Sequence, residues 1–264
     1  MTPWVPEMTL VLVGGHESGA GEQLGPWVES GHAFRAVGTG RALAEAVEAA
    51  LAHTDRPVCV VPMTLGRDHE LVADAARALR WIARSTTPGR LALTEPFGAA
   101  EHLVGWLRAA AGRDAEADDS TAVLVTAPAA DAFQDAELFR IARLVHRHGR
   151  HRRVEVAFTG PGADPDLAEG VDRCRRLGAE RVVLLPAAFG PAAAAPVPGA
   201  EDGGRLLSLQ AVAGVLDARA DAALHRLHHG QDGIAAGLDA AHGQGFAHSH
   251  GPGPGHSHGH THDH

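Results

Sequence analysis

Short β-branched runs alternate with longer helical patterns along this chain, and the whole order occurs twice. Strands are predicted at residues 9–13, 33–37, 58–62 and 91–94, and again at 121–125, 154–158, 181–186 and 206–209. Helical patterns follow at 41–52, 69–83 and 101–111, and again at 131–148, 166–177 and 211–227. Such alternation is typical of βαβ units around a parallel sheet, so we expect an α/β fold.

The two sets of elements also correspond in sequence. TLVLV at 9–13 matches AVLVT at 122–126, and VCVVP at 58–62 matches VVLLP at 182–186. An internal duplication explains both matches. We therefore expect two similar, doubly wound parallel-sheet halves, at residues 1–113 and 120–230, facing a central cleft. Parallel sheets place their functional groups at the carboxyl ends of the strands.

A third segment has a different composition. From residue 231 the hydrophobic periodicity ends, and residues 242–264 consist mainly of Gly, Ser, Pro and His. Such a sequence cannot bury a core, so residues 231–264 are predicted to be a disordered tail. Imidazoles spaced by small residues can bind divalent transition metals. The candidate metal-binding residues of the tail are His248, His250, His256, His258, His260, His262 and His264.

The composition excludes several functional classes. All 23 basic residues are arginine, so the chain has no lysine for a Walker-type phosphate site or a Schiff base. The formal charge of −9 argues against a nucleic-acid partner. No apolar run is long enough to cross a membrane, and the first residues do not resemble a signal peptide. We expect a cytoplasmic protein without a nucleic-acid or membrane partner.

Two histidines follow predicted strands of the first half. Strand one runs into Gly14 and Gly15, which permit a sharp turn before His16, and His69 follows strand three as a helix begins. If these two strands are neighbours, both imidazoles can enter one cleft and bind a divalent transition metal. Glu17 and Glu95 also follow strands. Glu17 could accept a proton or orient the imidazole of His16, but we expect it, like Glu95, to be an exposed loop carboxylate.

These turns resemble those of the class II tetrapyrrole chelatases, the family of the sirohydrochlorin cobaltochelatases and ferrochelatases. The similar segments are VGGHES at 13–18, PMTLGRDH at 62–69, TEPFG at 94–98 and DAFQDAELFRIARL at 131–144. The resemblance covers roughly residues 9–215. This chain departs from the family pattern by a second glycine before His16 and by Glu17 after it. The second half has no histidine at the matching positions, 126–128 and 189–191.

The resemblance implies a metal chelatase of the lyase class. The reaction would insert a divalent metal into sirohydrochlorin, for cobalamin-type or sirohaem-type biosynthesis. The metal, Co²⁺ by preference and otherwise Ni²⁺ or Fe²⁺, is a substrate, and no organic cofactor is expected. His16 is the expected base and metal ligand, and His69 is the second ligand.

The loop between strand three and the following helix is the expected substrate-binding segment. Sirohydrochlorin carries many carboxylates, and a guanidinium with backbone N–H groups at the start of a helix can bind them. The predicted residues are Leu65, Gly66, Arg67 and Asp68. The alternative function is a metal chaperone or storage protein on the same fold, without turnover. A metal-delivery partner is possible under either interpretation.

Overall fold

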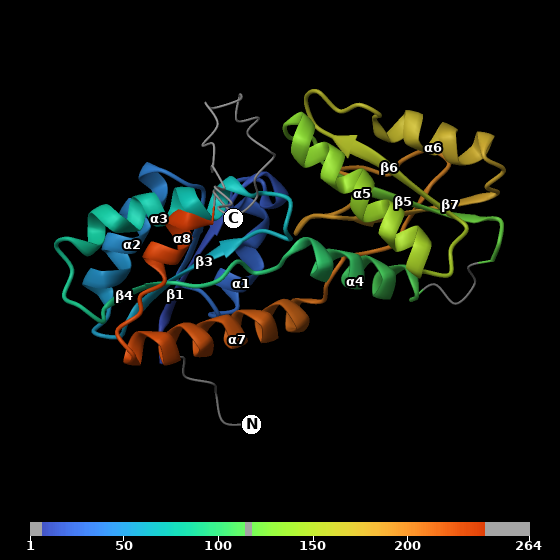
Figure 1. Cartoon of the computed structure of the whole chain (residues 1–264). Helices are drawn as coiled ribbons and strands as arrows, with labels where there is room; N and C mark the ends of the chain where they lie inside the picture. The colour runs from blue at the N-terminus through green and yellow to red at the C-terminus, as the bar shows by residue number, and fades with distance from the viewer. Residues whose placement is uncertain (1–6, 114–117, 241–264) are drawn as a thin grey trace, which may run out of the picture.

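The computed structural model describes residues 7–113 and 118–240, which form two separate parallel sheets (Figure 1). The first sheet has the strand order β2-β1-β3-β4, and the second has the order β6-β5-β7-β8. Every strand pair is parallel. The strands of the first sheet are β1 (Thr9–Gly14), β2 (Arg35–Val37), β3 (Val58–Met63) and β4 (Leu91–Leu93). Those of the second are β5 (Thr121–Pro128), β6 (Arg153–Thr159), β7 (Arg181–Pro186) and β8 (Glu201–Asp202).

The equal strand order of the sheets confirms the prediction of two similar, doubly wound halves. The central strand β3 is buried along its whole length, which explains its unbroken apolar sequence. The helices of the first half are α1 (Gly25–Glu29), α2 (Arg41–His53), α3 (Glu70–Ala83) and α4 (Ala100–Ala111), with short 3-10 turns η1 (His16–Ser18) and η2 (Glu22–Leu24). Those of the second half are α5 (Ala132–His148), α6 (Leu167–Arg176), α7 (Leu209–His228) and α8 (Ile234–Asp239).

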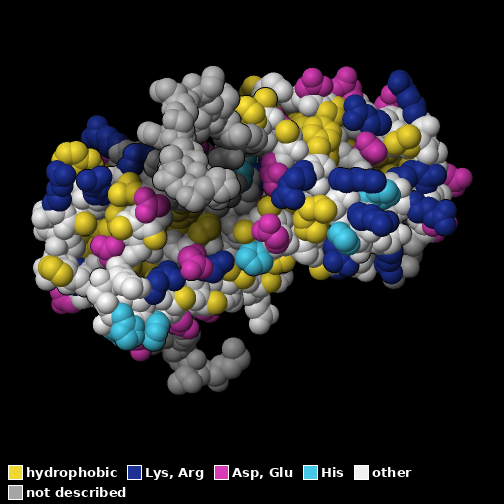
Figure 2. Space-filling model, viewed as in Figure 1, with side chains coloured by type: hydrophobic (Ala, Val, Ile, Leu, Met, Phe, Trp, Pro, Cys, Tyr) yellow, Lys and Arg dark blue, Asp and Glu magenta, His cyan; other side chains and the backbone are white. Residues whose placement is uncertain are grey.

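Helix α5 illustrates how the sequence specifies these helices. Asp131 caps its N-terminus, because its carboxylate accepts hydrogen bonds from the backbone N–H groups of Phe133 and Gln134. Leu138, Ile141 and Val145 recur at helical spacing and are buried. The opposite face carries arginine and histidine side chains, which Figure 2 shows gathered over this helix.

Two helices pack on the half of the molecule to which their place in the sequence does not assign them. Helix α4, which follows the first sheet, packs against α5 and β7 of the second half, whereas α7 packs against β3 and β4 of the first (Figure 1). One hydrophobic cluster consequently runs through both halves and includes Leu12, Phe97, Leu107, Val125 and Phe189. The predicted division at residues 113–120 thus lies between the two sheets, but helices from each side of it pack on the other half.

The eighth strand is not where the sequence predicts it. Residues 206–209 are not a strand, and the edge position is taken by β8 at Glu201–Asp202. Leu206 is buried in the shared core, which explains the apolar pattern without a strand. Ser208 then caps α7, because its Oγ accepts a hydrogen bond from the N–H of Ala211 at 3.1 Å.

The chain also stays ordered beyond residue 231, where the sequence places the start of the tail. The N–H of Leu93 donates to the carbonyl of Asp232 at 2.8 Å, and α8 packs on α3 with Ile234 buried. This segment covers the outer edge of β4, which would otherwise expose unpaired backbone groups. The remaining predicted tail, including His248 to His264, lies outside the described residues. Within the described part, no helix has the length and apolarity needed to cross a bilayer.

Candidate active site

The site predicted in the first half lies at the switch point of its sheet. Strands β1 and β3 are neighbours, with Val13 beside Pro62 and Gly14 beside Met63. From β1 the chain continues to β2 on one side, and from β3 it continues to β4 on the other. The loops that follow β1 and β3 therefore diverge at one point, where α/β sheets bind their ligands.

Two glycines, the last residue of β1 and the residue after it, permit a close approach that a larger residue would prevent. A Cβ on Gly14 would collide with the Ser18 hydroxyl and the backbone of Gly21, and one on Gly15 would collide with the Asp68 carboxylate. The Ser18 hydroxyl in turn accepts from the N–H of Gly21 at 3.2 Å and closes the turn. The chain can thus enter η1 directly, with His16 as its first residue.

His16 is paired with Asp68. Its Nδ1 atom lies 3.2 Å from Oδ2 of Asp68, and the two side chains are only 18% and 12% exposed. The Nε2 atom is buried and has no hydrogen-bond partner among the described residues. A carboxylate on one ring nitrogen fixes the tautomer and the ring orientation, so the other nitrogen can bind a metal or accept a proton.

The environment of Asp68 keeps it charged. Burial acts to raise the pKa of this carboxyl, but the hydrogen bond and charge of His16 oppose burial, as do backbone N–H groups of Leu71 and His16. Together these contacts outweigh burial, and the pKa of Asp68 lies below its ordinary value. Asp68 therefore positions His16, and its contact with substrate stays a prediction.

His69 lies at the N-terminal boundary of α3 and is partly buried. Its side chain makes no capping hydrogen bond. The residue in contact with the His16 ring is Asp68, so the role of His69 as second ligand stays a prediction. Within residues 7–113 and 118–240, no group of three or more His, Cys, Asp or Glu residues is arranged to hold a metal.

The expectation that Glu17 is an exposed loop carboxylate is wrong. Glu17 is 1% exposed, and its Oε2 atom accepts hydrogen bonds from the Thr64 hydroxyl and from the N–H of Leu65 at 2.9 Å. Its backbone carbonyl accepts from the N–H of Phe189, in the loop after β7, also at 2.9 Å. Glu17 thus fastens the His16 turn to the loop after β3 and to the second half. Glu95, by contrast, is 62% exposed, as expected.

The predicted substrate-binding loop uses most of its own N–H groups. Leu65 donates to Glu17, while Gly66 and Asp68 donate to the Thr64 hydroxyl at 3.0 and 3.2 Å. Gly66 has a φ of +106°, and a Cβ there would collide with the backbone of residues 99–100. These contacts hold the loop in a compact turn, and binding of substrate by its backbone stays a prediction.

Arg67 is enclosed between the two halves. It is fully buried, its NH2 group pairs with Oδ1 of Asp135 at 3.2 Å, and its Nε donates to the carbonyl of Gln134 at 3.3 Å. Burial lowers the pKa of the guanidinium, while the charges of Glu17, Asp135 and Asp68 act in the opposite direction. Arg67 therefore joins the loop after β3 to the first turn of α5. The sequence offers no signal for Asp135, because nothing local identifies a partner 68 residues away.

The matching edge of the second sheet is filled by packing. Phe189, after β7, makes ring contacts with Phe97 at 5.2 Å and with Trp27 at 6.5 Å between ring centroids. The Thr126 hydroxyl, two residues before the end of β5, donates to the carbonyl of Ala192 at 2.8 Å. The second half thus supports the His16 turn rather than repeating it.

Comparisons with known proteins bear on both the fold and the family. Residues 123–195 match the sequence model of the CbiX family. The resemblance to the chelatase family is confirmed. A 70-residue stretch is 36% identical to a sirohydrochlorin cobaltochelatase of Priestia megaterium, and covers 26% of this chain. The stretch spans only 22% of that relative's length. The CbiX match lies in the second half and does not include His16 or His69.

Solved structures agree with the fold. The sirohydrochlorin chelatase SirB from Bacillus subtilis subspecies spizizenii, in complex with cobalt, aligns with a TM-score of 0.51 at 13% identity. SirB from Bacillus subtilis with Fe³⁺ aligns with a TM-score of 0.52 at 14% identity. Each alignment covers 85% of this chain and 98% of the other. At this level of sequence identity, the likeness shows that this chain and SirB share a fold.

Proposed function

We propose that this chain is a sirohydrochlorin chelatase whose reactive group is the Nε2 atom of His16. The observation that carries the proposal is the His16–Asp68 pair at the switch point of the first sheet. It leaves a buried imidazole nitrogen oriented and without a partner among the described residues. The name of the Priestia megaterium relative supports sirohydrochlorin as the substrate.

The reaction needs a group that can take protons and hold a cation. Two pyrrole N–H protons leave the macrocycle as one divalent metal enters, with no change in oxidation state. When the imidazole of His16 is neutral and its Nδ1–H donates to Asp68, the ring's lone pair lies on Nε2. That lone pair can accept a pyrrole proton or bind the incoming metal. His69 is the proposed second ligand.

Imidazole ligands favour Co²⁺ or Ni²⁺ over Fe²⁺ in the affinity order of divalent metals. We propose Co²⁺ as the metal substrate, with Ni²⁺ and Fe²⁺ as competitors. The expected site of action is the cytoplasm, where the free cysteines Cys59 and Cys174 would remain reduced.

Residues 241–264 lie outside the described chain, and their function is proposed from composition. Their histidines would collect divalent metal and raise its concentration beside the site. Deletion of residues 241–264 is expected to lower the rate at limiting Co²⁺ and to leave the rate at saturating Co²⁺ unchanged. An equal loss at both concentrations would contradict a role in metal supply.

The alternative is a metal chaperone or storage protein on this fold. The two functions are separated by the anaerobic absorbance change of sirohydrochlorin with Co²⁺, Ni²⁺ and Fe²⁺ in turn, at substrate well above enzyme concentration. A chelatase forms many product molecules per chain and faster than the uncatalysed reaction. A chaperone binds the metal but leaves the rate of product formation unchanged with all three metals.

A further inference from the structure

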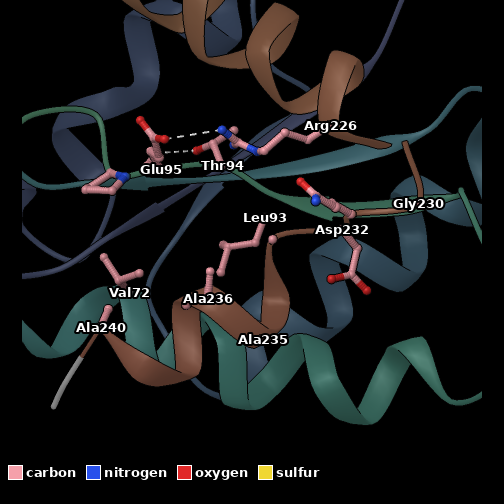
Figure 3. A pocket seen from close by; sticks show the side chains of 14 residues that line it. Val72, Leu93, Thr94, Glu95, Arg226, Gly230, Asp232, Ala235, Ala236 and Ala240 are labelled. Atoms are coloured by element: carbon pink, nitrogen blue, oxygen red, sulfur yellow. Dashed lines mark hydrogen bonds and ion pairs between the residues drawn. The ribbon is translucent and has the colours of Figure 1, made fainter. Parts of the chain in front are cut away.

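A cavity of about 600 Å³ lies on the outer side of the first sheet (Figure 3). It is bounded by residues 93–96 at and after the end of β4, by Val72 in the first turn of α3, by Arg226 near the end of α7, and by residues 230–233 and 235–237 around the start of α8. Its wall is mostly apolar, with Val72, Leu93 and Ala236 among the lining residues, and its size is typical of a site for a small ligand.

The cavity lies beyond the carboxyl end of β4, and the loop that holds His16 follows the carboxyl end of β1 in the same parallel sheet. Leu93, the last residue of β4, lies beside Val60 of β3, which lies beside Val11 of β1, and β3 and β1 each continue for three more residues, to Met63 and Gly14. Val72 lines the cavity and lies one turn of α3 beyond His69.

The polar side of the cavity is an ion-paired group of three residues. Glu95 is paired by Oε2 with Arg219 at 3.0 Å and by Oε1 with Arg226 at 3.3 Å. Both arginines come from α7, and among the described lining residues Arg226 is the one basic side chain. Asp232 also lines the cavity, but its carboxylate accepts from the N–H of Ile234, and Figure 3 shows it turned away from the Glu95–Arg226 pair.

This group is suited to exchange one carboxylate for another. Glu95 is 62% exposed, so its ion pair with Arg226 contributes little stability and another carboxylate can displace it. Arg226 is 27% exposed, and a guanidinium binds an incoming carboxylate by paired hydrogen bonds. Arg67, the arginine predicted for this task, is fully buried and already paired with Asp135.

We propose that the cavity is the subsite for a peripheral carboxylate of the tetrapyrrole, and that Arg226 binds this carboxylate in place of Glu95. The proposal rests on the proposed function. In it, the apolar wall accepts the edge of the macrocycle, and Glu95 holds the guanidinium in position until substrate arrives. Arg219 keeps its contact with Glu95 throughout.

The test is equilibrium binding of metal-free sirohydrochlorin, followed by its absorbance and fluorescence, to the full-length chain. Arg226→Gln is expected to weaken binding at least tenfold, and Arg226→Lys less than that. Arg219→Gln is the matched control, because it removes the other ion pair of Glu95 without altering the lining of the cavity, and should change binding less than twofold. Glu95→Gln is expected to tighten binding severalfold, since it removes the competing carboxylate.

The subsite would be overturned if Arg226→Gln and Arg219→Gln weakened sirohydrochlorin binding equally, or if Glu95→Gln weakened it. Either result would mean that the ion pairs serve only to stabilise the fold. Thermal unfolding of each variant identifies losses caused by misfolding. Turnover of the unaltered chain separates the two proposals. If the unaltered chain forms product and Arg226→Gln binds sirohydrochlorin as tightly as the unaltered chain does, the subsite alone is rejected. If the unaltered chain binds sirohydrochlorin but forms no product, the chelatase function is rejected, and the binding of the variants still tests the subsite. No binding by the unaltered chain rejects both.

Discussion

The Nδ1 atom of His16 lies 3.2 Å from a carboxylate oxygen of Asp68, although the two residues belong to different loops. The loops leave adjacent parallel strands at one edge of the sheet, which is why residues so far apart in sequence meet there. A carboxylate bound to one nitrogen of a histidine sets the direction of the other. The pair therefore defines where a metal or a pyrrole proton would be received.

Replacing Asp68 by Asn should lower kcat for metal insertion about 10-fold to 100-fold, the usual range for the carboxylate partner of a ligating histidine. The amide keeps the size of the side chain but no longer fixes the tautomer of His16. Asp74→Asn is the matched control, because Asp74 makes an ion pair on the exposed face of α3. Equal kcat values for Asp68→Asn and Asp74→Asn would contradict a positioning role.

The stabilising effect of Asp68 should depend on pH in one direction. Because its pKa is lower in the folded chain than in the unfolded one, its contribution is complete above the unfolded value of about 3.9 and is lost as the pH falls through the folded value. Denaturant unfolding at pH 7, 5, 4 and 3 would measure this. The difference in free energy of unfolding between the unaltered chain and Asp68→Asn should shrink as the pH falls below 4. A loss between pH 7 and 5 would assign the effect to another group.

Gly15→Ala should separate His16 from Asp68. A Cβ at this position would collide with the Asp68 carboxylate, so the carboxylate or the turn must move. We expect kcat to fall at least tenfold, since small displacements of catalytic groups are costly. Gly25→Ala is the control, because a Cβ there meets nothing within 4 Å. Activity in Gly15→Ala equal to that in Gly25→Ala would show that the close approach of the two loops is not required.

Arg67→Met should destabilise the chain by about 3–5 kcal/mol, because it leaves the buried carboxylate of Glu17 and the partner Asp135 without their counter-charge. Arg77→Met provides the comparison, since the Arg77–Asp74 pair is exposed and its loss should cost about 0.5 kcal/mol or less. Urea unfolding at pH 7 measures both. Equal stability of the two variants would mean that Arg67 does not join the halves.

The sequence predicted the features that depend on local pattern. The duplication predicted two similar parallel-sheet halves, and the glycines before His16 predicted a turn at the carboxyl end of β1. These predictions succeeded because apolar periodicity and turn chemistry are local properties.

Features that depend on contacts between distant segments could not be predicted. Glu17 is buried because Thr64 and Leu65 meet it across 47 and 48 residues. The crossing of α4 and α7 depends on which apolar face fits which sheet, and amphipathic patterns alone do not distinguish the two sheets. The helix α8 was missed because Gly, Asp and Ala surround it, and packing on α3 rather than its own propensity holds it.

The central claim, that the Nε2 atom of His16 carries the chemistry, is tested most directly by one comparison. Anaerobic conversion of sirohydrochlorin with Co²⁺ would be followed by absorbance for the unaltered chain, His16→Ala and His148→Ala, the last an exposed histidine at the end of α5. We predict turnover above the uncatalysed rate in the unaltered chain and in His148→Ala, and none above that rate in His16→Ala. Turnover retained in His16→Ala, with the chain folded, would contradict the claim.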